Sequence, residues 1–203
     1  SLIMKKILYL LPLFVLLACK DPDNPLGAKF NNKGCLECDN YIAGDEFILG
    51  GVKYVVADRP LIENAIADGD ELTRYCTSRI TDMSELFYSN YTFNKDIGNW
   101  DVKNVTDMSY MFHSALAFNK SIANWDVSNV SNMKYMFSYA QKFNQDIGAW
   151  DVSKVGNMTR MFSGASVFNQ NLSKWCVANI PTMPEYFSTA SSLNTSNLPV
   201  WGT

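Results

Sequence analysis

Hydrophobic residues recur every 25 positions through most of this chain, and the same residue types return at the same phases. The tryptophans of this pattern are Trp100, Trp125, Trp150 and Trp175. The methionines are Met83, Met108, Met133, Met158 and Met183, and a phenylalanine follows each of them four residues later. A fixed period of this kind predicts a solenoid, because each repeat needs its neighbours to bury its apolar side chains.

One repeat predicts a short strand followed by a short helix. Trp100 and Val102 alternate with Asp101, which is typical of a strand with one buried face. Four apolar residues then follow at helical spacing: Met108, Met111, Phe112 and Ala115. Each such helix begins at a candidate N-cap residue: Asp82, Asp107, Asn132, Asn157 and Thr182. The pattern therefore predicts an α/β repeat solenoid, leucine-rich-repeat-like, with short parallel strands and short helices. A three-sided β-helix is the competing solenoid.

The chain ahead of the repeats predicts a small cap. Residues 47–56 (FILGGVKYVV) predict a hairpin that turns at its two glycines, and residues 60–67 (PLIENAIA) predict a helix. We expect this hairpin-plus-helix N-terminal cap to occupy residues 41–70 and to cover the open end of a solenoid of five turns over residues 71–203. Residues 19–40 are rich in Pro, Gly, Asn and Asp, and predict a flexible tether.

The N-terminus predicts export and a lipid anchor. Residues 1–18 place two lysines before an apolar run, which is typical of a signal peptide. The run ends in LLAC, which resembles a bacterial lipobox, so we expect Cys19 to be lipidated and to anchor the protein to a membrane. The expected location is the outer membrane or the cell surface. An ordinary signal peptide that happens to contain a cysteine is the alternative.

Composition argues against several function classes. The chain has 203 residues, 47% of them hydrophobic, and a net charge of −3, so it lacks the basic character of a nucleic-acid-binding protein. His113 is the single histidine, which leaves little room for a Ser-His-Asp or Cys-His site or for a multi-histidine metal site. We therefore expect no enzymatic activity, no cofactor and no metal.

Polar residues also form columns along the repeats. Asp101, Asp126 and Asp151 are expected to point outward on adjacent strands, about 4.8 Å apart, where a cation, a nearby amide or solvation would relieve their repulsion. Solvation is the favoured interpretation. The asparagines that recur from Asn94 to Asn194 are interpreted as satisfying backbone groups in a tight bend, and the methionine columns as core rather than a soft-metal site. The exposed strand positions form a candidate ligand face: Asn99, Asp101, Lys103, Asn124, Asp126, Ser128, Asp151 and Ser153.

The cysteines predict a disulfide. If Cys19 is lipidated, four cysteines remain, which allows three connectivities, and an exported protein favours disulfides. Cys35 and Cys38 form a lone CxxC without a second pair or a suitable histidine, which argues against zinc. We expect one of Cys35 or Cys38 to pair with Cys76. Cys176 shares the repeat phase of Cys76 but lies four repeats away, roughly 19 Å, which is beyond disulfide reach.

The repeats also resemble a known family. The units FNKDIGNWDVKNVTDMSYMF, FNKSIANWDVSNVSNMKYMF and FNQDIGAWDVSKVGNMTRMF resemble those of BspA-like leucine-rich-repeat surface proteins, and the likeness covers residues 70–203. The resemblance implies a cell-surface protein associated with adhesion or with host and matrix contact, and it supplies no catalytic residues. From the lipobox, the tether and a repeat that multiplies one surface, we expect the coils to bind another macromolecule, a protein or a glycan. A structural or spacer protein of the envelope without a specific ligand is the alternative. The resemblance also implies a cysteine after the final WGT that could bridge to Cys176, which leaves open that the chain is a C-terminally truncated fragment.

Overall fold

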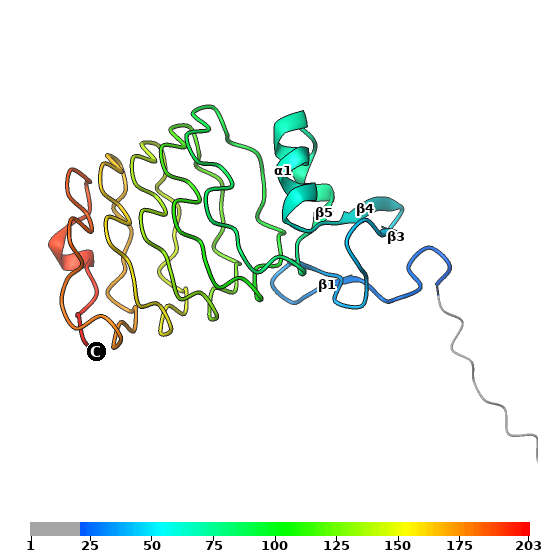
Figure 1. The fold of residues 1–203 in the computed structure, drawn as a ribbon. Coiled ribbons are helices and arrows are strands. Elements are labelled where there is room, and N and C mark those ends of the chain that lie inside the picture. Colours follow the sequence, from blue (N-terminus) through cyan, green and yellow to red (C-terminus); the bar gives the residue numbers. More distant parts are fainter. Residues whose placement is uncertain (1–20) are drawn as a thin grey trace, which may run out of the picture.

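The computed structural model describes residues 21–203, so the predicted signal peptide and the predicted lipidation site, Cys19, lie outside the described residues. Two small sheets lie at the N-terminal end of the molecule (Figure 1). Their strands are β1 (Lys29–Phe30), β2 (Leu36–Glu37), β3 (Glu46–Leu49), β4 (Val52–Val56) and β5 (Tyr75–Cys76). Strands β1 and β2 pair antiparallel, as do β3 and β4, and β5 adds to β4 in parallel. The hairpin expected ahead of the repeats is thus present as β3 and β4.

Helix α1 (Arg59–Asp68) begins and ends where its sequence directs. The Asp58 side chain accepts a hydrogen bond from the Leu61 backbone N–H at 3.0 Å, and Pro60 occupies the first turn, where no N–H is needed. Gly69 ends the helix in the left-handed conformation that glycine adopts without steric cost. Ile62 and Ala65 are buried in one hydrophobic cluster with the repeats, so α1 covers the first of them.

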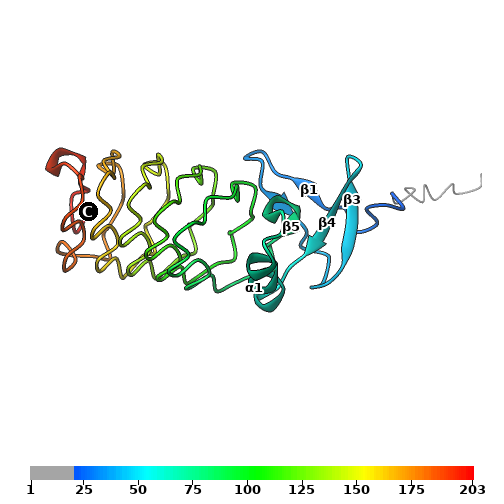
Figure 2. The same cartoon turned by 90° about the horizontal axis from the view of Figure 1, so that it is seen from above.

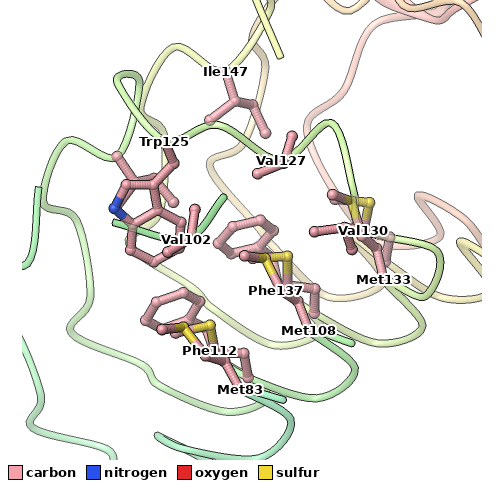
Figure 3. Close-up of a cluster of buried hydrophobic side chains, with 14 of the residues drawn as sticks. Met83, Val102, Met108, Phe112, Trp125, Val127, Val130, Met133, Phe137 and Ile147 are labelled. Atoms are coloured by element: carbon pink, nitrogen blue, oxygen red, sulfur yellow. The ribbon is translucent and has the colours of Figure 1, made fainter. Parts of the chain in front are cut away.

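From Leu72 onward the chain winds into coils that stack side by side (Figures 1 and 2). Phenylalanines of successive coils form two columns, whose neighbouring ring centroids lie 5.3 to 5.8 Å apart along the column from Phe87 to Phe162 and along that from Phe93 to Phe168. Figure 3 shows the methionines and phenylalanines of successive coils in register below Trp125. Each coil therefore supplies the same side chains to one continuous core, which we call the coil core.

The tryptophans line up as the period predicts. Trp100, Trp125, Trp150 and Trp175 are all buried. Each indole N–H donates to the backbone carbonyl of the residue 28 positions earlier, at 3.0 to 3.2 Å. Because every indole bonds to the preceding coil, the tryptophans fix the spacing of the coils as well as filling their interior.

The short helix predicted for each repeat is wrong. Between Met108 and Ala115 the backbone makes consecutive turns, because Tyr110 and Ser114 take positive φ angles of 58° and 57°. The N–H of Tyr110 donates to a carbonyl of the next coil at 2.9 Å, and that of Ser114 does so at 2.8 Å. Hydrogen bonds between coils therefore replace those that a helix would make within itself, while the same methionine and phenylalanine side chains stay buried.

The helix caps and the strands predicted for the repeats are also wrong. Asp107 accepts a hydrogen bond from the N–H two residues later, at 2.7 Å, but no helix follows it. The segment 100–102 is not a strand, because the turn bonds of Trp100 to Ile97 and of Val105 to Val102 lie within the coil rather than across to a neighbour. Among the described residues, strand-like bridges between coils are isolated and parallel, and they lie along the cap positions from Asp82 to Asn157.

The flexible tether predicted for residues 19–40 is wrong for its described part, residues 21–40. Leu36 is completely buried, and its N–H donates to the Asn99 carbonyl at 2.8 Å. The Asn24 side chain bonds both the N–H and the carbonyl of Ala28, at 2.8 and 2.7 Å. We call residues 29–39 the strap. The strap is ordered by side-chain bonds to backbone and by a disulfide, and neither depends on the long apolar runs whose lack suggested a tether.

Candidate binding surfaces

The aspartate column has a structural role. The Oδ1 atoms of Asp101, Asp126 and Asp151 each accept the backbone N–H two residues later, at 3.0 to 3.1 Å. Hydrogen bonds from Ser153 hold the pKa of Asp151 below its usual range. Burial acts to raise the pKa of Asp126, but the bonds from Ser128 outweigh it and the pKa is lowered. Local amides, rather than the solvation that the sequence favoured, therefore stabilise these carboxylates.

The strap covers the N-terminal end of the predicted ligand face. Asp101 is only 2% exposed and accepts a hydrogen bond from the Ser78 hydroxyl at 2.7 Å. The Lys103 ammonium lies 2.7 Å from a carboxylate oxygen of Asp39 in the strap and 3.4 Å from one of Asp101. Asn99 is also held, since its carbonyl accepts the N–H of Leu36. Asn99, Asp101 and Lys103 are therefore parts of an internal contact, and Asp101 is buried rather than pointing outward as expected.

The rest of that predicted face is divided. Asn124 and Asp126 line a hollow of about 200 Å³ beside the strap, together with Lys33 and Cys35. Asp151 is exposed, and Ser128 and Ser153 are half-buried, with their N–H groups bonded to the aspartates. The structure thus does not bring the eight predicted residues together as one open surface.

The asparagine column serves the backbone, as the sequence predicts. The side-chain oxygen of each of the first four asparagines accepts the N–H of the asparagine one coil later, at 2.8 to 3.0 Å; the column consists of Asn94, Asn119, Asn144, Asn169 and Asn194. The last of them, Asn194, accepts the N–H of Ser196 at 3.3 Å. The methionine columns are likewise core, with Met83, Met108, Met133 and Met158 fully buried. Met183 differs, since it is 46% exposed.

Of the two disulfides that the sequence left open, the structure contains Cys38–Cys76, with Cα atoms 6.4 Å apart. Cys35 remains a buried free thiol, and burial together with the Asp101 charge raises its pKa to about 11. Cys176 is free and exposed. Within residues 21–203 no three metal-binding side chains come together as a site, and no helix in that range is long and apolar enough to cross a membrane.

A further surface, rich in aromatic side chains, runs along the coils at their left-handed turns. We call it the tyrosine face, and its members are Tyr88, Tyr110, His113, Tyr135, Tyr139 and Tyr186. The rings of Tyr110 and Tyr135 stack at 4.6 Å, and His113 stacks on Tyr88 at 5.0 Å. Tyr88, Tyr139 and Tyr186 each leave about half of their surface exposed, at 49%, 51% and 48%. Rings from successive coils thus form one continuous surface.

Two cations lie on the rings of the tyrosine face. The Arg160 guanidinium lies 4.5 Å from the ring centre of Tyr186 and 5.5 Å from that of Tyr135. The Lys134 ammonium lies 5.5 Å from the ring centre of Tyr135 and 5.9 Å from that of Tyr110. Neither cation forms an ion pair with any of residues 21–203. Their charges therefore remain available to a ligand.

The backbone beneath the tyrosine face is already paired. Along one coil the N–H groups of Met83, Glu85, Phe87 and Ser89 donate in turn to carbonyls of the next coil, at 2.8 to 3.0 Å. Two side-chain atoms there have no hydrogen-bond partner, namely His113 Nδ1 and Ser138 Oγ. Burial lowers the pKa of His113, which keeps the imidazole neutral at pH 7. Recognition at this surface therefore depends on side chains.

The period concealed this surface, because its aromatic residues do not form one column. Tyr110 and Tyr135 share a phase, but their equivalents in the flanking coils are Glu85 and Arg160. The sequence indicates the surface only through two pairs of aromatic residues that each share a repeat phase: Tyr110 with Tyr135, and Tyr88 with His113.

A family model described as Mycoplasma protein of unknown function, DUF285, matches residues 60–156 and again residues 120–203. Together the two matches span all of the coils and helix α1 from its second residue onward. No curated protein and no solved structure matches the chain.

Proposed function

The chain belongs to the family described as Mycoplasma protein of unknown function, DUF285, and we propose that it is a non-catalytic bacterial surface protein whose coils bind another macromolecule, a protein or a glycan. The tyrosine face carries this proposal. Large exposed aromatic patches are typical of interaction sites, and tyrosine and arginine are the residue types that most often dominate binding energy. The leucine-rich-repeat-like class and the finer assignment to BspA-like surface proteins belong to the same proposal, and the likeness of the three quoted repeat units supports them.

Export and lipid anchoring at Cys19 are part of the proposal. The lipobox-like sequence supports them, and so does the Cys38–Cys76 disulfide, since such bonds persist in oxidising compartments and are rare in reducing ones. An anchor at Cys19 would leave the cap next to the membrane and the coils beyond it. Palmitate labelling of the wild type beside Cys19→Ser, with protease treatment of intact cells, tests the anchor and its orientation.

A spacer protein without a specific ligand is the second candidate. The asparagine and aspartate columns favour the spacer, because their side chains form hydrogen bonds within the chain and need no ligand to account for them. The two candidates differ over the tyrosine face, since a spacer has no need of exposed tyrosines carrying unpaired cations.

The test is binding of the purified protein to an array of host and microbial glycans and proteins. The test variant is Tyr139→Asn, because asparagine tolerates the left-handed backbone that Tyr139 adopts at a φ of 57°. The matched control is Asp151→Asn on the predicted ligand face, where asparagine keeps the Oδ1 acceptor of the turn. We expect Tyr139→Asn to weaken binding about tenfold, as loss of an interface tyrosine does, and the control to bind as the wild type does. Loss in the control alone would refute the tyrosine face, and no ligand at all would favour the spacer.

A further inference from the structure

We propose that the tyrosine face binds an acidic polysaccharide, whose sugar rings lie against the exposed tyrosines while its carboxylate or sulfate groups reach Lys134 and Arg160. This inference rests on the function proposed above and names the class of its ligand. It starts from the two cations that flank the ring of Tyr135, each 5.5 Å from the ring centre.

The charges of the tyrosine face favour an acidic ligand. Lys134 and Arg160 have no carboxylate partner within residues 21–203, and the acidic residues at the equivalent turns, Glu85 and Glu185, form no ion pair with either of them. An aromatic ring under a cation holds it in place without neutralising it. The chain has a net charge of −3, so its overall field does not attract an anion. Affinity for an acidic ligand therefore depends on these two side chains.

The shape of the exposed tyrosine rings suits a sugar. A pyranose ring presents C–H bonds on its faces and hydroxyls at its edge, and a tyrosine ring with its hydroxyl offers the matching apolar surface and polar tip. Tyr88, Tyr139 and Tyr186 are half exposed. The rings of Tyr88 and Tyr139 lie 5.0 and 5.9 Å from that of His113, so an extended sugar chain that crosses the coils meets more than one tyrosine.

An acidic peptide fits the tyrosine face less well than a polysaccharide does. A peptide gains affinity by adding a strand to a free backbone edge or by placing side chains in pockets. The N–H groups at these turns already donate to the next coil, as at Glu85 and Ser89, so they offer no edge. A hollow of about 480 Å³ lies between the strap and the first coils, lined by residues such as Asp39, Arg79 and Lys103, and not on the tyrosine face. A polysaccharide needs neither feature.

The experiment is affinity electrophoresis of the purified protein in native gels that contain polygalacturonate, dextran sulfate or neutral dextran. We expect the two acidic polymers to retard the wild type, and neutral dextran to leave its mobility unchanged. Lys134→Gln combined with Arg160→Gln should weaken retardation at least about tenfold, because charge-assisted contacts are lost. Raising the salt concentration should weaken it as well. The matched control is Lys174→Gln, which removes an exposed lysine elsewhere on the coils and should bind as the wild type does.

Tyr139→Asn separates this inference from the function on which it rests. If the acidic polymers bind and both the cation variant and Tyr139→Asn weaken binding, the inference stands. Equal retardation by neutral dextran that Tyr139→Asn abolishes would overturn the acidic ligand and keep the tyrosine face as a binding site. Retardation that Lys174→Gln weakens as much as the cation variant does would overturn the site. No retardation by any polymer would overturn the inference, and binding of a protein on the array would then still support the proposed function.

Discussion

Removing the Cys38–Cys76 disulfide is expected to destabilise the N-terminal end of the protein by about 4 kcal/mol. The bond joins residues 38 positions apart. In the chain-entropy model, closing a loop of that length restricts the unfolded chain by an amount worth about 4 kcal/mol at 25 °C. The bond also holds the strap in place, because Leu36, which bonds to Asn99 of the coils, lies two residues from Cys38.

The test variant is Cys38→Ala with Cys76→Ala, measured by urea unfolding followed through tryptophan fluorescence. The expected result is a lower free energy of unfolding, with new protease cleavage within residues 29–39. The matched control is Cys35→Ala, because Cys35 is equally buried but forms no disulfide. If the double variant unfolds at the same urea concentration as the wild type and its strap stays resistant to protease, the disulfide does not order the strap and the reasoning fails.

Three further predictions concern the coils. Phe137→Ala should cost about 3 to 5 kcal/mol of unfolding free energy in urea, because its ring is fully buried and stacks on both flanking coils at 5.5 and 5.6 Å; a cost below about 1 kcal/mol would mean that the column does not stack. Gly164→Ala should lower the melting temperature and weaken ligand binding, since a Cβ there lies 2.6 Å from Cδ1 of Tyr139 at a φ of +71°. Gly156→Ala is its control, with nothing within 4 Å, and an equal effect of both would contradict the clash. Because the folded-state pKa of Asp151 is lowered, its contribution to stability is present above its unfolded pKa and disappears as the pH falls through the folded value. Asp151→Asn should therefore reduce the loss of stability measured in acid, and an unchanged acid profile would contradict it.

The sequence predicts which side chains are buried better than it predicts the backbone that carries them. Met108, Met111, Phe112 and Ala115 lie at helical spacing, and all four are buried. Consecutive turns bring the chain back to the same side after three or four residues, just as a helix does, so the spacing does not separate the two. Turns and a helix differ in the partners of their backbone N–H groups, and here those partners belong to the next coil.

Little in the sequence predicts the left-handed turns. Tyr110, Ser114 and Tyr139 adopt positive φ angles, although none of them is a residue that favours this conformation. The inter-coil hydrogen bonds stabilise these turns, and they form only after the coils stack. Gly164, at the repeat phase of Ser114 and Tyr139, is the one residue of the described coils at that phase whose type announces the turn. The order of the strap was missed for a related reason: the sequence predicts a disulfide to Cys76, but it does not predict the hydrogen bond from Leu36 to Asn99, which joins distant parts of the chain.

The difference between columns that stay the same and columns that vary explains where a ligand should bind. Every coil must close the same bend, so the side chain that satisfies the bend is the same in each, as in the column from Asn94 to Asn194. The phase that holds Glu85, Tyr110, Tyr135 and Arg160 changes from coil to coil, because the structural bond at that phase is made by the backbone. Side chains there are free of the requirements of the fold. A repeat protein can therefore build recognition into its irregular positions, and the most regular polar columns are the poorest candidates for a ligand site.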